Sequence, residues 1–339
     1  MVSARPNALQ AMQNSGTVLI ADTADFQQIA RFRPSEGTTN PSLLLLAAKE
    51  TAYSGLISQT SAYLKSLDNA QGCEELAVEY LAVLFGTEIY KLTGRVSTEV
   101  DVIYSFDTAQ TVAAALRIIQ LYATQGVPKE AVRIKISATW EGIAAGKILQ
   151  EQHGISVLIT IVFGLVQAIT AAEAGVDCIA PYIGRISDWH KAHGSSQGTD
   201  GGVETVTQMQ NYLRKYSYKT KVMGASFRST AQVKALAGVD LLTISPTILE
   251  ALEKETEDVP IMLTEQTGGL AHLHYIPWNS INIYTAKSCV AQQVSYLNNE
   301  AAFRWAFNKD ACAVEKSAEA MRKFAEDTER LKELLRGLS

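Results

Sequence analysis

Short runs of β-branched and other apolar residues alternate along the chain with longer segments of helical period. The runs typical of strands occupy residues 17–21, a short stretch near Thr38, and residues 100–105, 133–137, 157–163, 178–182, 221–225 and 241–245. Helical patterns occupy residues 108–124, 143–152, 166–174, 203–215 and 230–236. Eight strands that each precede a helix, without a break in composition, predict one parallel (β/α)8 TIM barrel over residues 1–339. A doubly wound open sheet is the alternative, although no glycine-rich phosphate loop follows the first strand.

Capping residues and the C-terminal part of the chain refine this prediction. The expected helix starts are Ser42 after Pro41, Asp107 or Thr108, and Ser229 or Thr230. Residues 313–338, rich in Ala, Glu, Lys and Arg, predict a long amphipathic helix whose charges form a solvated face.

Residues 258–298 form an unusual insertion after the last predicted strand. The pair His272 and His274 could face one side of a strand, but no further ligand stands nearby. An aromatic lid or a dimer patch is therefore favoured over a metal site.

Composition and charge argue against several classes of function. Of the 339 residues, 47% are hydrophobic and 19% charged, which is typical of a globular protein with a large core. The net charge of −5 favours neither nucleic acid nor an anionic membrane as a partner. The four cysteines are far apart, so reduced thiols without a zinc site are expected. No signal segment or membrane-spanning run is evident, and the expected location is cytoplasmic.

Lys135 is the most informative single residue. It lies in the stretch Ile134-Lys135-Ile136-Ser137, directly before a helix start, and strand alternation places it opposite the two isoleucines. Burial disfavours the ammonium form and makes an amine a nucleophile for carbonyl carbon. An edge-strand lysine that reaches solvent is the structural alternative.

Active-site residues of such barrels lie at the C-terminal ends of the strands. The polar residues at or near those ends are Asp22, Asn40, Glu99, Lys135, Thr160, Arg185, Ser226 and Arg228. Burying eight polar side chains at one mouth would be costly without a function.

These segments together resemble the transaldolase family. The motifs that carry the resemblance span nearly the whole chain: Ala21-Asp22-Thr23, Gly37-Thr38-Thr39-Asn40-Pro41-Ser42, Gly94-Arg95-Val96-Ser97-Thr98-Glu99-Val100-Asp101, Ile134-Lys135, Thr139-Trp140-Glu141-Gly142, Gly184-Arg185-Ile186, Asp188-Trp189, Met223-Gly224-Ala225-Ser226-Phe227-Arg228, Phe303-Arg304-Trp305 and Glu315-Lys316.

The resemblance implies Schiff-base chemistry without a metal or organic cofactor. Lys135 would form an imine with a ketose, and Asp22 would take the proton from the C4 hydroxyl as the C3–C4 bond breaks. Glu99, with Thr160, would hold the water that shuttles protons.

The resemblance also implies how substrate is held. Asn40 would orient the donor. Arg185 and Arg228, helped by Ser226, would bind the substrate phosphate.

Each role has a structural alternative. Asp22 could cap the following helix, and Glu99 could pair with Arg185. Ser226 could be a helix cap, and Asn40 a turn residue before proline.

Departures from the family pattern gather at the donor-binding positions. Leu158 replaces an asparagine and Ala180 a serine, and in the family those two side chains bond the C1 hydroxyl of the dihydroxyacetone unit. Tyr182 replaces a phenylalanine, as in fructose 6-phosphate aldolases, in which the tyrosine shares the catalytic water. Losing two polar partners removes about 1–3 kcal/mol of discrimination for a hydroxyl. The resulting hypothesis is a hydroxyacetone-like donor, or loosely bound dihydroxyacetone.

Three functional hypotheses follow. The first is a transaldolase of carbohydrate metabolism, including the pentose phosphate pathway, acting on sugar phosphates. The second is a fructose-6-phosphate-aldolase-like lyase or synthase in a specialised biosynthetic pathway. The third is a silent paralogue, which the intact Asp22, Glu99 and Lys135 disfavour. A homodimer is a further expectation.

Overall fold

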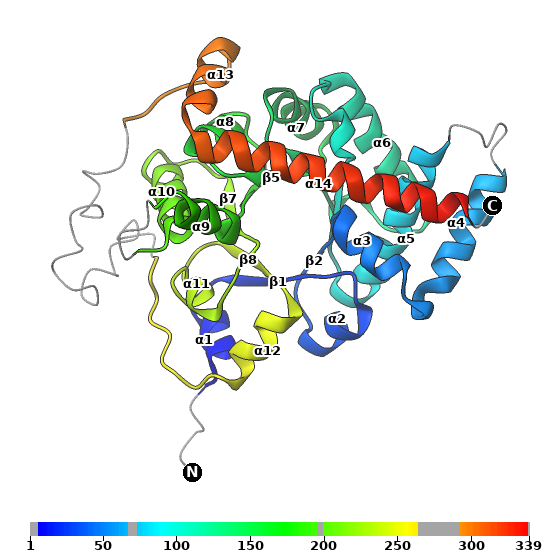
Figure 1. Cartoon of the computed structure of the whole chain (residues 1–339), viewed down its shortest axis with the longest axis horizontal. Helices are drawn as coiled ribbons and strands as arrows, with labels where there is room; N and C mark the ends of the chain where they lie inside the picture. The colour runs from blue at the N-terminus through cyan, green and yellow to red at the C-terminus, as the bar shows by residue number, and fades with distance from the viewer. Residues whose placement is uncertain (1–5, 67–72, 195–198, 264–291, 338–339) are drawn as a thin grey trace. The chain divides into compact units, whose positions relative to one another are not determined.

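The computed structural model describes residues 6–66, 73–194, 199–263 and 292–337 (Figure 1). Its strands form a closed barrel in the order β1 to β8, and every recorded strand pairing is parallel. The parallel (β/α)8 barrel is thus confirmed and the doubly wound sheet excluded. The strands are β1 (Val18–Asp22), β2 (Gly37–Thr38), β3 (Val96–Glu99), β4 (Val132–Ser137), β5 (Ser156–Val162), β6 (Cys178–Pro181), β7 (Lys221–Gly224) and β8 (Leu241–Ile244).

Helices separate these strands and complete the C-terminal part. The described α-helices are α1 (Ala8–Asn14), α2 (Phe26–Phe32), α3 (Pro41–Ala48), α4 (Ser54–Ser66), α5 (Glu74–Thr93), α6 (Thr108–Thr124), α7 (Trp140–His153), α8 (Leu165–Glu173), α9 (Ile183–Ala192), α10 (Gly201–Lys215), α11 (Thr230–Lys234), α12 (Pro246–Lys254), α13 (Glu300–Lys309) and α14 (Ala311–Arg336). None of the helices within the described residues is long and apolar enough to cross a membrane.

The chain divides into two compact units. The first comprises residues 1–20 and 159–317, and the second residues 21–158 and 318–339. In the second unit, the register places Ala21 opposite Gly37 and Glu99 opposite Lys135. In the first unit, Met223 lies opposite Leu241, and an isolated bridge joins Tyr182 to Ala225.

Strand β4 is buried along its whole length, on both faces. This explains why its apolar positions Ile134 and Ile136 alternate with polar residues that are equally withdrawn from water. Helix α7 starts close to the end of this strand. The approach is so close that a Cβ on Gly142 would lie 2.2 Å from the Ser137 carbonyl oxygen. Glycine at this position lets α7 pack against β4.

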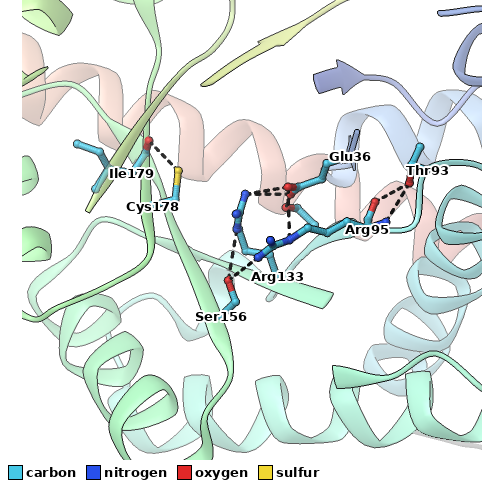
Figure 2. A network of polar contacts seen from close by, with 8 residues as sticks. Glu36, Thr93, Arg95, Arg133, Ser156, Cys178 and Ile179 are labelled. Atoms are coloured by element: carbon cyan, nitrogen blue, oxygen red, sulfur yellow. Dashed lines mark hydrogen bonds and ion pairs between the residues drawn. The ribbon is translucent and has the colours of Figure 1, made fainter. Parts of the chain in front are cut away.

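Arg133 anchors the start of β4 in a buried polar network (Figure 2). Its Nη1 donates to both carboxylate oxygens of Glu36, at 3.1 and 2.9 Å. The guanidinium of Arg95 lies 3.7 Å from the same carboxylate, and Ser97 donates a hydrogen bond to it. Ser156 accepts hydrogen bonds from both arginines. A buried carboxylate is tolerated because cations and hydroxyls surround it.

The strand expected at residues 100–105 is wrong. The strand is Val96–Glu99, and Val102–Tyr104 forms a 3-10 turn. Gly94 ends α5 in the left-handed conformation, so the chain enters the sheet directly after it. The side chain of Asp101 then accepts a hydrogen bond from the Ile103 amide, which starts the turn.

The expected helix start at Ser42 is also wrong by one residue, since α3 begins at Pro41. Asn40 caps α3, because Pro41 fits the first helical position and holds the preceding residue in an extended conformation. Asp107 caps α6, and Ser229 caps α11, each within the expected pair of residues.

The predicted C-terminal helix is confirmed as α14, but its charges do not all form a solvated face. Asp327 and Lys332 are buried. The reason is that neighbouring elements supply partners: Ser42 for Asp327, and Glu75 for Lys332. The interior of the predicted insertion, with His272 and His274, lies outside the described residues, and its boundaries stay a prediction.

Candidate active site

Lys135 is enclosed near the end of β4, with 4% of its surface exposed. Its Nζ donates to the Thr39 carbonyl oxygen at 2.8 Å and lies 3.4 Å from Glu99 Oε2. The burial excludes a lysine that reaches solvent. The contact with a backbone carbonyl gives the amine a defined direction.

Glu99 faces Lys135 from the neighbouring strand, and its side chain is 2% exposed. Glu99 Oε2 is the carboxylate oxygen near Lys135 Nζ, and among the described residues no hydrogen bond within ordinary geometry reaches either oxygen of Glu99. Burial raises the pKa of Glu99, while the charge of Lys135 lowers it and that of Asp22 raises it further. A carboxyl group that retains its proton to higher pH is suited to acid–base exchange.

Asp22 is the second carboxyl group near the lysine. It ends β1, and its Oδ1 accepts a hydrogen bond from Thr38 Oγ1 at 3.0 Å. Burial raises the pKa of Asp22, against the lowering effects of Lys135 and of the Thr38 hydroxyl. Asp25 caps α2. The cap alternative for Asp22 is therefore wrong.

The segment from Thr38 to Asn40 connects these groups. The side-chain hydroxyl of Thr38 donates a hydrogen bond to Asp22, whereas the backbone carbonyl of Thr39 accepts one from the Lys135 amine. Asn40 Oδ1 accepts a hydrogen bond from the Leu43 amide at 3.0 Å. The structural alternative for Asn40 is thus correct in part: it is a pre-proline helix cap. Its amide NH2 remains the group that could donate to a substrate.

Thr160 and Tyr182 belong to the first unit. The hydroxyls of Thr160 and Tyr182 are 3.0 Å apart and buried. The guanidinium carbon of Arg185 lies 5.5 Å from the centre of the Tyr182 ring, and Phe163 packs edge-on against that ring. Two hydroxyls at this spacing can share one proton or orient a water molecule.

The two departures from the family pattern lie on buried strand positions. Leu158 on β5 and Ala180 on β6 are 1% and 3% exposed. Neither side chain can donate or accept a hydrogen bond.

Ser226 and Arg228 are joined by a side-chain contact. Arg228 Nη1 donates to the carbonyl oxygen and Oγ of Ser226, and its Nε and Nη2 donate to Asp188 Oδ2 at 3.1 and 2.9 Å. A Cβ on Gly184 would lie 2.2 Å from the Ser226 carbonyl oxygen, so glycine permits this approach. Ser229 caps the following helix, and the cap alternative for Ser226 is wrong.

Thr38 and Asp188 bind two of the expected site residues, although no role was expected for them from the sequence. Thr38 and Gly37 point to opposite faces of β2, and the Thr38 hydroxyl donates to the Asp22 carboxyl group. Strand alternation could have indicated which of the two residues faces Asp22. Asp188 stands one turn after Gly184 in α9, on the helix face that meets Arg228. Metal ligation has no support in the described ranges, where no group of three or more His, Cys, Asp or Glu residues could hold a metal ion.

The raised pKa of Glu99 predicts a pH-dependent gain in stability for Glu99→Gln. Between the ordinary and the raised pKa, the folded state binds the proton and the unfolded state has lost it, so the wild type loses stability as pH rises. The variant lacks this loss and should exceed the wild type by on the order of 1 kcal/mol at pH 7 and by less at pH 4. Urea unfolding at both values of pH measures the difference.

Glu88→Gln, at an exposed position paired with Lys91, is the matched control and should change little. A Glu99→Gln protein that is less stable than wild type at pH 7 would show that the ion pair with Lys135 outweighs the cost of burial.

Comparisons with known proteins identify the family of the chain. The family described as Transaldolase/Fructose-6-phosphate aldolase matches residues 19–335. The chain is 44% identical over 335 residues to the transaldolase of Kluyveromyces lactis, covering 97% of this chain and 95% of that protein. It is 45% identical to the Saccharomyces cerevisiae transaldolase, with 97% and 94% covered, and 44% identical to the human one, with 94% and 90% covered. The chain belongs to the transaldolase and fructose-6-phosphate aldolase family, as a transferase of the transaldolase type.

Proposed function

We propose that this chain transfers a three-carbon ketol unit from a ketose phosphate to an aldehyde acceptor through an imine on Lys135. The observation that carries the proposal is the lysine amine itself. It is withdrawn from water, directed by the Thr39 carbonyl and placed beside Glu99. An unprotonated amine held in this way is a nucleophile for a ketone.

Each step then has a residue suited to it. The Lys135 amine adds to the ketose carbonyl, and the carbonyl oxygen leaves as water to give an iminium. Asp22 accepts the C4 hydroxyl proton, the C3–C4 bond breaks, and its electron pair moves into the iminium to form an enamine. An aldose leaves. The enamine then adds to the acceptor aldehyde, Asp22 returns the proton, and water releases the product ketose from Lys135.

The raised pKa of the two carboxyl groups supports their roles as proton carriers. Glu99 is proposed to exchange protons with the water that is released and consumed at the imine carbon. Thr160 and Tyr182, whose hydroxyls already share a hydrogen bond, are proposed to bind that water. Asn40 is proposed to orient the donor through its side-chain NH2.

Substrate phosphate is assigned to Arg185, Ser226 and Arg228. Guanidinium groups make forked contacts with phosphate oxygens. Arg228 supports this role because its side chain is held between Asp188 and Ser226 and remains 44% exposed. Sugar phosphates are accordingly the proposed partners, whereas nucleic acid and membranes are not. A cytoplasmic location and a homodimer complete the proposal.

Lys135→Met should abolish both turnover and covalent capture of substrate. Methionine fills the lysine's volume but cannot form an imine. Incubation with fructose 6-phosphate and borohydride, followed by peptide mass spectrometry, should give an adduct on Lys135 in the wild type and none in the variant. Lys147→Met, at a surface lysine paired with Glu151, should keep the adduct. A wild-type protein without an adduct would refute the imine.

The apolar side chains Leu158 and Ala180 favour a donor with a methyl group in place of the C1 hydroxyl. Ala180→Ser restores one polar partner and should shift the ratio of kcat/KM for dihydroxyacetone over hydroxyacetone upward by about tenfold, which is about 1.4 kcal/mol. Steady-state kinetics with both donors measures the ratio.

Ala172→Ser, at a buried alanine of α8, is the matched control and should leave the donor ratio unchanged. A wild type that strongly prefers dihydroxyacetone would contradict the proposed donor class.

The aldolase alternative is favoured by one contact, the hydrogen bond between Tyr182 and Thr160. A second hydroxyl that orients water would speed hydrolysis of the three-carbon imine relative to transfer. Tyr182→Phe should lower the release of free dihydroxyacetone from fructose 6-phosphate about tenfold relative to transfer. Product analysis with and without an acceptor aldehyde measures this partition. Equal partition in Tyr182→Phe and wild type would remove the support for the alternative.

A further inference from the structure

The residues proposed for imine chemistry depend on one short segment, 38–42. Within it, Thr38 bonds Asp22, and the Thr39 carbonyl accepts the hydrogen bond from Lys135 Nζ. Asn40 caps helix α3, and Pro41 occupies its first turn. A shift of this segment would therefore move the acceptor of the lysine amine, the partner of Asp22 and the Asn40 side chain together.

Ser42 ties this segment to the other end of the chain. Its Oγ donates to Asp327 Oδ2 at 2.5 Å. Asp327 belongs to α14, is 2% exposed and also accepts a hydrogen bond from Lys323 at 2.7 Å. A buried carboxylate is costly unless hydrogen bonds and cations compensate it, and Ser42, Lys323 and Arg330, whose Nη1 lies 3.6 Å from Asp327 Oδ1, do so here. Nothing in the proposed catalytic steps uses it directly.

The apolar contacts of α14 do not explain the need for this carboxylate. Leu331 and Leu335 pack in one hydrophobic cluster with Leu44 and Leu45 of α3 and with residues of α5, and Figure 1 shows this end of α14 alongside both helices. Apolar packing is non-directional and tolerates small displacements of one helix along another. The Ser42–Asp327 hydrogen bond is directional and sets where α3 begins relative to α14.

Further polar contacts hold α14 on α5 instead of α3. Lys332 donates to Glu75 at 2.9 Å, and Arg336 donates to Glu74 at 3.0 Å. Neither contact involves the segment 38–42. The structure thus distinguishes the polar contacts that dock α14 on α5 from the Ser42–Asp327 contact, which reaches the segment 38–42.

We propose that Asp327 is a positioning residue for the imine-forming amine. Through Ser42 it holds the first turn of α3, and through Asn40 and the rigid Pro41 it holds the Thr39 carbonyl that directs Lys135. The C-terminal helix is thereby a functional part of the active site without touching substrate. This inference rests on the proposed imine chemistry.

The test compares variants by the rate of imine trapping at saturating donor, together with kcat, KM and the melting temperature. Asp327→Ala and Ser42→Ala should each lower the trapping rate and kcat about tenfold, with smaller changes in KM, because the amine is misdirected. Asp327→Asn should retain near wild-type rates, since its amide oxygen still accepts from Ser42. The double variant should be no slower than either single variant.

Leu331→Ala is the matched control for a purely structural role. It leaves the hydrogen bond intact but should lower the free energy of unfolding by about 2–5 kcal/mol. Its trapping rate, measured well below its melting temperature, should equal that of the wild type.

The inference is overturned if Asp327→Ala traps donor as fast as wild type, if Asp327→Asn is as slow as Asp327→Ala, or if Leu331→Ala is equally slow. Absence of an adduct in the wild type would instead refute the imine itself. The two failures are therefore distinguishable.

Discussion

The Lys135 amine is buried beside two carboxyl groups, those of Asp22 and Glu99. The candidate site in the second unit depends on this burial. Burial favours the neutral amine, whereas the carboxyl groups favour the ammonium, and burial raises the pKa of both acids. These opposing effects place two buried acids beside the amine, and the proposed mechanism uses them to exchange protons. An ordinary ion pair would hold the proton on the lysine, and a wholly apolar pocket would leave no acid to exchange it.

Two buried basic side chains on strand β4, Arg133 and Lys135, have different partners. Arg133 and Lys135 are two positions apart on β4 and therefore point to the same face of the strand. Arg133 donates hydrogen bonds to both oxygens of Glu36 and to the hydroxyl of Ser156 (Figure 2). Lys135 Nζ lies 3.4 Å from Glu99 Oε2, and within the described part of the chain neither Glu99 oxygen accepts a hydrogen bond of ordinary geometry. The closely bonded Arg133–Glu36 pair suits a structural anchor, while the Glu99 carboxyl group beside Lys135 retains the capacity to bind a reacting group.

Much of this organisation is predictable from the sequence because its causes are local. Strand and helix periods predicted the barrel, and apolar neighbours around Lys135 predicted its burial. The prediction for the third strand is wrong because the apolar run 100–105 has strand-like composition. In the structure, the Asp101 side chain accepts a hydrogen bond from the Ile103 amide and starts a turn there. Asp327 and Lys332 were expected in solvent because helical periodicity cannot show which partners other elements bring. Contacts between distant segments are the part that a single sequence does not reveal.

The separation of tasks within α14 has a physical basis. Apolar side chains provide most of the free energy that docks a helix, but they define its position only loosely. A buried hydrogen bond adds little net stability, yet it penalises every arrangement in which its partners separate. Placing one such bond at Ser42 restricts the segment that orients Lys135 while leaving the docking energy to Leu331 and its neighbours. A residue near the end of the chain can then govern the direction of an amine almost two hundred positions earlier.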